Sequence, residues 1–106
     1  MQLNQNTIQE IKTIMFNYLS GYEFESFIFG SWATGTAREN SDIDLGIKIS
    51  AGSLDEKVFE NLKNAFIESD IPYYIDVVDF NHTSEEFKKV SLNKILPLSN
   101  NDRPGN

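Results

Sequence analysis

The chain has 106 residues, with 9 basic and 16 acidic side chains and a formal net charge of −7. This length predicts one domain, and the acidic balance argues against broad nucleic-acid binding, which needs a basic surface. The absence of cysteine excludes disulfides, thiolate metal sites and cysteine nucleophiles, and one histidine excludes a polyhistidine metal cluster. No apolar run approaches the ~20 residues of a membrane span, and the first residues lack a targeting pattern. We therefore expect a cytoplasmic protein.

The first half of the chain predicts a helix and a strand, followed by a segment of small residues. Apolar residues recur at helical spacing over residues 8–19. Thr7 and Glu10 have the spacing of a capping box, and Gly21 is expected to end the helix. The aromatic-rich stretch 24–29 predicts a strand, and the small residues after it, 31–37, could hold a short helix.

The second half predicts two further strands and two further helices. Apolar and polar or small residues alternate over residues 42–49, which predicts a half-buried strand. Ser53 is expected to cap the next helix, residues 73–80 are typical of a third strand, and Thr83 is expected to cap a last short helix. The order of elements predicts an α/β fold in which helices cover one small sheet.

The domain is expected to comprise residues 1–98. The remaining residues, 99–106, are polar and are expected to form a disordered tail.

Two features between the first two predicted strands indicate chemistry. Gly30 and Ser31 follow the first strand, where glycine lets the backbone approach a ligand closely and a helix start suits phosphate. Asp42 and Asp44 lie two residues apart on the second strand, so both side chains point to the same face. Such carboxylates repel each other unless a cation lies between them. They suit Mg²⁺, which also binds the oxygens of a nucleoside triphosphate, although an Asp-x-Asp pair is also common on exposed strands.

A third carboxylate strengthens this interpretation. Asp76 lies in the middle of the third predicted strand, between two apolar residues, where an aspartate is unexpected unless it is paired or binds a metal. Asp79 lies near the strand end and on the opposite face, so we prefer Asp76 as the third ligand. Three carboxylates can hold two Mg²⁺ ions for phosphoryl or nucleotidyl transfer.

Taken together, these residues resemble a known signature. Gly30 and Ser31, ten intervening residues and then Asp42-Ile43-Asp44 resemble the motif of nucleotidyltransferases of the DNA polymerase β superfamily. Asp76 extends the match, and the short chain resembles the minimal nucleotidyltransferase branch, with a small mixed sheet covered by helices.

The resemblance implies an activity and a set of site residues. Asp42, Asp44 and Asp76 would form the catalytic and metal-binding set for Mg²⁺, and Gly30 and Ser31 would bind the triphosphate of ATP. Members of this branch are typically encoded beside a helical HEPN-type partner. In such toxin–antitoxin pairs, some transfer AMP to a tyrosine of the partner toxin, and others are seen as the catalytic half of a two-subunit enzyme.

The sequence departs from the family pattern after the Gly-Ser pair. Trp32 and Thr34 stand where the family often has basic residues. Arg38 and Lys48 are the nearby cations that could neutralise a triphosphate, although Arg38 could equally be a solvated loop charge. Trp32 could stack on a base or a protein partner, or could simply pack in the fold.

Three functions remain open from the sequence. The first is AMP transfer to a hydroxyl of a partner toxin. The second is an antitoxin that neutralises its partner by binding alone, and the third is the catalytic subunit of a two-chain enzyme that modifies a small molecule. The chain has little room for an acceptor domain, so we expect another chain to present the acceptor. A homo- or hetero-oligomer is possible, and neither a membrane nor a nucleic-acid partner is expected.

Overall fold

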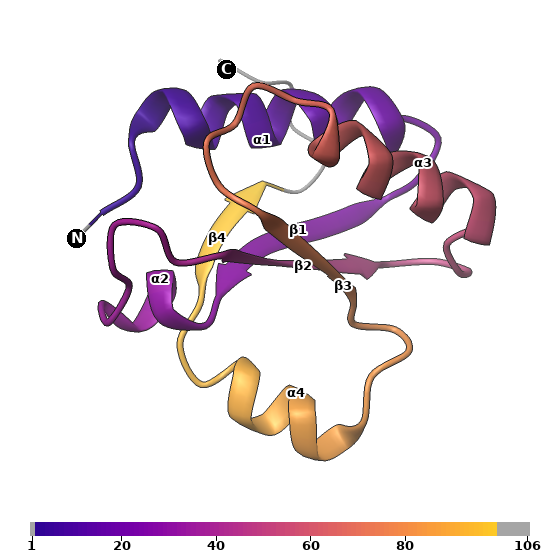
Figure 1. The fold of residues 1–106 in the computed structure, drawn as a ribbon. Coiled ribbons are helices and arrows are strands. Elements are labelled where there is room, and N and C mark those ends of the chain that lie inside the picture. Colours follow the sequence, from indigo (N-terminus) through magenta and orange to yellow (C-terminus); the bar gives the residue numbers. More distant parts are fainter. Residues whose placement is uncertain (1, 100–106) are drawn as a thin grey trace.

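The computed structural model describes residues 2–99, which form a four-stranded sheet with helices on both faces (Figure 1). In chain order the elements are α1 (Gln5–Tyr18), β1 (Phe24–Phe29), α2 (Ser31–Thr34), β2 (Ile43–Ile49), α3 (Glu56–Ile67), β3 (Ile75–Asp79), α4 (Glu85–Ser91) and β4 (Leu96–Ser99). The strand order is β3-β2-β1-β4. β1 pairs antiparallel with β2 and β4, whereas β2 and β3 are parallel. The predicted α/β class with a short mixed sheet is therefore confirmed.

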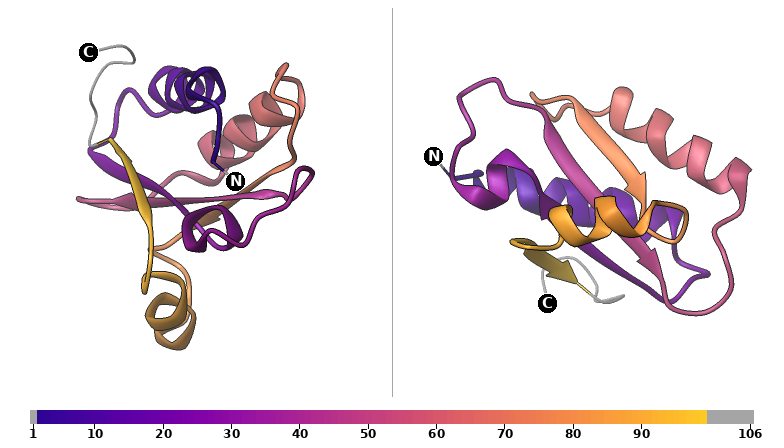
Figure 2. Two further views of the ribbon diagram at one scale, coloured as in Figure 1. Left: turned by 90° about the vertical axis from the view of Figure 1, so that its left-hand side faces the viewer. Right: turned by 90° about the horizontal axis from the view of Figure 1, so that it is seen from below.

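The main core lies between the sheet and the helices α1 and α3, which cover the same face (Figures 1 and 2). Alternate residues of β2 point into this core, and its four apolar side chains from Ile43 to Ile49 are at most 2% exposed. Ile11 and Met15 of α1 and Leu62 of α3 meet them there. The period-two pattern of the sequence thus identified the buried face of β2 correctly.

A smaller aromatic core lies on the opposite face, under α4. The rings of Phe27, Phe29 and Phe80 contact one another, with centroids 4.9–6.2 Å apart. Phe87 of α4 joins them in edge-on and tilted contacts with Phe29 and Phe80. Gly46 lies beneath these rings, and a Cβ there would overlap the Phe27 ring. This cluster holds α4 against the face of the sheet that carries Asp44.

The helix caps differ from the predicted ones by one to three residues. Asn4, Asp55 and Ser84 cap α1, α3 and α4, and the side chain of each accepts a hydrogen bond from a backbone N–H in the first turn. Each start holds more than one residue of capping type, and the residue with extended backbone just before the first turn is the cap. At the other end, α1 stops at Tyr18, before the predicted Gly21.

The strand β4 was not predicted from the sequence. It is four residues long and contains Pro97, which is tolerated because β4 lies at the edge of the sheet. Ser99, placed in the predicted tail, pairs with Ser26 and ends β4. Residues 100–106 of that tail lie outside the described residues. Among residues 2–99, no helix is both long and apolar enough to cross a bilayer.

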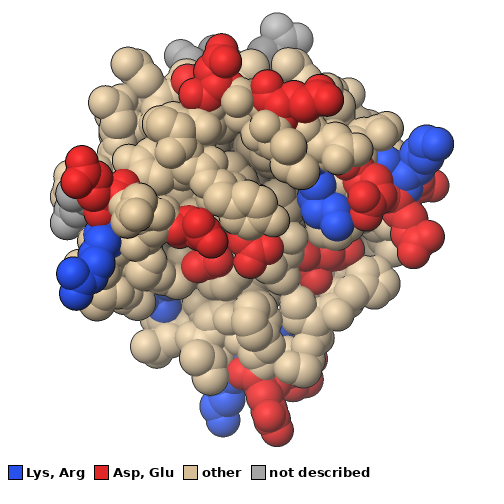
Figure 3. Space-filling view, viewed as in Figure 1, with Lys and Arg blue, Asp and Glu red and all other residues tan. Residues whose placement is uncertain are grey.

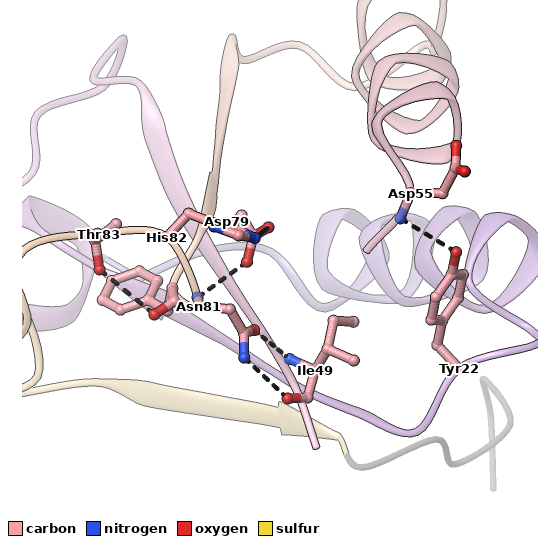
Figure 4. A network of polar contacts seen from close by, with 8 residues as sticks. Tyr22, Ile49, Asp55, Asp79, Asn81, His82 and Thr83 are labelled. Carbon is pink, nitrogen blue, oxygen red and sulfur yellow. Dashed lines mark hydrogen bonds and ion pairs between the residues drawn. The ribbon is translucent and has the colours of Figure 1, made fainter. Parts of the chain in front are cut away.

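Asn81 fastens the loop after β3 to the end of β2 (Figure 4). Its side-chain oxygen accepts from the backbone N–H of Ile49 at 2.7 Å, and its amide donates to the Ile49 carbonyl at 3.1 Å. Its own N–H donates to the Asp79 carboxylate at 3.0 Å. Nearby, the exposed ring of His82 lies 3.7 Å from the same carboxylate, so the histidine belongs to this loop.

Replacing Asn81 with Ala is expected to lower the free energy of unfolding by about 1–3 kcal/mol, because two backbone groups of Ile49 lose their partner. Chemical denaturation checks this value. Asn93→Ala is the control, since Asn93 is exposed and lies outside this network. Equal unfolding midpoints for the two variants would contradict the role of Asn81.

Candidate active site

Gly30 makes the turn between β1 and α2 and lies against the carboxylate of Asp44. Its backbone has φ 72° and ψ −151°, which favours glycine, and a Cβ there would overlap the Asp44 side chain. The register explains the contact, since Phe29 pairs with Asp44. The Gly30 carbonyl accepts from the N–H groups of Ala33 and Thr34, both at 3.0 Å. The Gly-Ser turn is therefore built directly beside a carboxylate.

Trp32 holds the loop that leads to Asp42. Its ring is 4% exposed and meets the edge of Tyr73, with centroids 5.4 Å apart. Its indole N–H donates to the carbonyl of Ser41 at 3.0 Å. Trp32 is therefore a positioning residue inside the core. The alternative that it stacks on a base or on a partner is wrong for this structure.

The structure brings Asp44 and Asp76 together on neighbouring strands. The two residues are partners in the parallel register of β2 and β3, where strands lie ~4.8 Å apart. Both point away from the main core, because the residues after them, Leu45 and Val77, point into it. In Figure 3, acidic side chains are spread over the face viewed, one group of them near its middle.

Asp44 carries the electrostatic signature of this arrangement. Burial raises the pKa of its carboxyl above the usual value, and the negative charges of Asp76 and Asp42 raise it further. Asp42 is exposed and immediately precedes β2. Asp79 lies on the other face of β3, beside His82, and is not part of this set. Asp42 and Asp76 thus both lie within electrostatic reach of Asp44.

The chain as a whole matches a known protein family. The model of the polymerase beta nucleotidyltransferase family matches residues 6–103. The chain belongs to this family. It is therefore a nucleotidyltransferase, as the Gly-Ser and Asp-x-Asp pattern predicted, and every candidate site residue lies within the matched range.

The chain is also similar to individual proteins, one by sequence and others by structure. The chain is 36% identical over 90 residues to the probable protein adenylyltransferase MntA of Haemophilus influenzae, covering 85% of this chain and 76% of the relative. It resembles a crystal structure of a toxin–antitoxin with AMP-PNP, with a TM-score of 0.70, 23% identity and coverage of 92% and 74% of the two chains. A mutant of the toxin–antitoxin MntA–HpeT gives a TM-score of 0.69 at 23% identity, covering 93% and 74%. These structures confirm the polymerase-β-like fold.

The donor chemistry of this nucleotidyltransferase fits Mg²⁺. Its three carboxylates supply the hard oxygen ligands that the ion prefers. Burial and the charges of Asp76 and Asp42 raise the pKa of Asp44, and a bound cation would stabilise its ionised form. Among residues 2–99, however, no group of three or more His, Cys, Asp or Glu side chains is close enough to hold an ion by itself. Mg²⁺ commonly completes its shell with water and substrate phosphates, so a bound triphosphate would supply the missing oxygens.

The two candidate cations lie in different places. Arg38 is exposed in the loop before Asp42. Its backbone N–H donates to the Ser41 Oγ at 2.8 Å, and its carbonyl accepts from the Ser41 N–H at 3.0 Å. No ion pair joins it to another described residue. Lys48 pairs with Glu25 at the far end of β2, about 13 Å from Asp44 at the strand rise of ~3.3 Å per residue. Arg38 therefore remains a candidate for the triphosphate, whereas Lys48 is too distant.

Proposed function

We propose that this nucleotidyltransferase uses Mg²⁺ to transfer AMP from ATP to a hydroxyl of a partner protein, and that it thereby acts as the antitoxin of a HEPN-type toxin. The observation that carries the proposal is the Gly30 turn against Asp44, with Asp76 in register beside it. The Haemophilus influenzae relative is named as a probable protein adenylyltransferase, and similar structures are toxin–antitoxin complexes, one of them with AMP-PNP. ATP is a cytoplasmic metabolite, so we place the reaction in the cytoplasm.

In this proposal the three carboxylates have distinct roles. Asp42 and Asp44 would hold Mg²⁺, which neutralises phosphate charge when it is bound. Asp76 would complete the metal set and orient the acceptor hydroxyl, because its side chain is more exposed to solvent than that of its register partner Asp44. Gly30 and Ser31 would lie against the triphosphate, because the Gly30 backbone lies directly beside the Asp44 carboxylate that would hold Mg²⁺.

The proposed reaction is a single displacement at the α-phosphorus. The acceptor oxygen forms a bond to that phosphorus while the bond to the bridging oxygen breaks, and pyrophosphate leaves with the bonding electrons. The proton of the hydroxyl passes to Asp76 or to water. The products are an AMP ester of the acceptor and pyrophosphate, and Arg38 would offset the negative charge that grows on the leaving group.

The test compares ATP labelled at the α-phosphorus with ATP labelled at the γ-phosphorus. The protein is incubated with Mg²⁺ and the product of the neighbouring gene, and label on that product is measured. We expect only the α-label to be transferred. Transfer of the γ-label would show a kinase reaction and overturn the proposal. Absence of any label, with the partner still neutralised, would favour an antitoxin that acts by binding alone, and label on a small molecule would favour the two-chain enzyme.

A further inference from the structure

A groove of about 260 Å³ runs along the open edge of the sheet, between β3 and α3. Figure 2 shows β3 as the outermost strand on this side, with α3 beside it. Residues 74–77 form one wall, and one face of α3 forms the other: Glu60, Lys63, Asn64 and Ile67. Consecutive strand residues alternate between the faces of a sheet. A groove lined by four of them in a row therefore follows the backbone edge of β3.

The backbone of β3 offers free hydrogen-bonding groups to this groove. The carbonyl of Tyr74 accepts from Ile43 at 2.9 Å, and the N–H of Phe80 donates to Ile47 at 2.8 Å. Because the bonding direction alternates along a strand, the backbone groups of Ile75 and Val77 point away from β2. No strand among residues 2–99 lies on that side of β3.

The two edges of the sheet differ in their capacity to accept another strand. At the opposite edge, β4 carries Pro97, which has no N–H to donate. At the β3 edge, two large apolar side chains lie open beside the free backbone groups, with Tyr74 61% exposed and Ile67 69% exposed. An edge with unpaired backbone and exposed apolar contacts is a template for an added strand.

Asp76 connects this groove to the candidate active site. It lines the groove and is also the register partner of Asp44. It lies between Ile75 and Val77, so a chain paired with the free backbone of those two residues would pass directly beside its carboxylate. Asp76 therefore belongs both to the lining of the groove and to the proposed position of the acceptor hydroxyl.

We propose that an extended segment of the acceptor protein adds to the sheet along β3 and presents its hydroxyl at Asp76. This inference rests on the proposed function, because it assigns the position of the acceptor in that reaction. The segment pairs its backbone with Ile75 and Val77, and an apolar side chain near the acceptor residue contacts Ile67 and Tyr74.

A matched pair of substitutions on α3 tests the groove. Asn64→Trp places a bulky ring in it, whereas Asn61→Trp places the same ring at an exposed position of the same helix outside it. In steady-state AMP transfer to the product of the neighbouring gene, we expect Asn64→Trp to raise KM for that protein by about tenfold or more, because the ring blocks the docked segment. KM for ATP should stay unchanged in both variants. Equal KM values for the protein in the two variants would overturn the proposal.

Amide hydrogen exchange tests the strand pairing without relying on catalysis. With the same partner protein added to the full chain, the N–H groups of Ile75 and Val77 should become protected, and that of Gly52, in the distant turn after β2, should not. Protection without any AMP transfer would overturn the proposed function and support the docking edge. AMP transfer without protection would support the proposed function and overturn the docking edge. Absence of binding would also overturn the docking proposal.

Discussion

Replacing Asp44 with Asn is expected to reduce AMP transfer by roughly 10³-fold, because the variant loses the central charge that would hold Mg²⁺ against the triphosphate. Asp44 connects the Gly-Ser turn with the other carboxylates, since it lies against Gly30 and pairs in register with Asp76. The initial rate of transfer of α-labelled AMP checks this. Asp70→Asn is the control, because Asp70 is an exposed acid in the loop between α3 and β3. Transfer within tenfold of wild type in Asp44→Asn would contradict the assignment.

The same substitution should make the metal-free protein more stable at neutral pH. The pKa of Asp44 is raised by burial and by the charges of Asp76 and Asp42, so the folded protein binds a proton there more tightly than the unfolded chain does. The ionised carboxylate therefore destabilises the fold, increasingly so as the pH rises through the raised pKa. Below the ordinary value of 3.8, both states are protonated and this penalty disappears.

Thermal unfolding in EDTA measures this effect. Asn cannot ionise, so the unfolding midpoint of Asp44→Asn should exceed that of wild type at pH 7, and the difference should shrink as the pH falls toward 3.8. A variant that is inactive and also less stable at pH 7 would indicate a structural role for Asp44. Lost activity together with gained stability is the signature of a functional carboxylate.

Replacing Gly30 with Ala is expected to lower AMP transfer by about 10²-fold or more, because a displacement of about 1 Å in a catalytic group has this effect. The new Cβ would overlap the Asp44 carboxylate and force it to move. The residue would also have to adopt a φ of 72° with a ψ of −151°, a region almost confined to glycine, which costs about 1–3 kcal/mol for an L-residue.

Gly35→Ala separates these two causes. Gly35 has a φ of 87° and a ψ of 10°, the left-handed helical region, where an L-residue costs about 1–2 kcal/mol. Apart from its chain neighbours, no atom lies within 4 Å of the added Cβ. We expect both variants to lose unfolding free energy from backbone strain, Gly30→Ala the more, with a large loss of kcat only in Gly30→Ala. Similar kcat values would mean that the close approach of Gly30 to Asp44 has no catalytic importance.

The alternation of polar and apolar residues was enough to predict the arrangement of the carboxylates. It placed Asp42 and Asp44 on one face of a strand and assigned Asp79 to the opposite face from Asp76. The structure agrees for Asp44, Asp76 and Asp79, whereas Asp42 lies just before β2. Side-chain direction in a strand depends only on the residue's parity once one face is buried. Because the Gly-Ser pair and the Asp-x-Asp pair flank two neighbouring predicted strands, the sequence also indicated that they would meet at the strand ends, as Gly30 and Asp44 do.

Features that depend on packing between distant segments could not be predicted. Trp32 looked available for stacking, and only the position of Ser41 and Tyr73 in the fold shows that it is buried. β4 is short and contains proline, so no local pattern identified it. The groove beside Asp76 requires α3 to lie along the edge of β3, a placement that no sequence spacing specifies.

Metal-dependent AMP transfer by these carboxylates should be visible in the intact mass of the partner protein. The product of the neighbouring gene is incubated with ATP and either wild-type protein or the double variant Asp42→Asn/Asp44→Asn, in Mg²⁺ or in EDTA. We predict a mass increase of one or more AMP groups only with wild-type protein in Mg²⁺. The same mass increase with the double variant would show that AMP transfer does not depend on these carboxylates, and with wild type in EDTA that it does not depend on the metal.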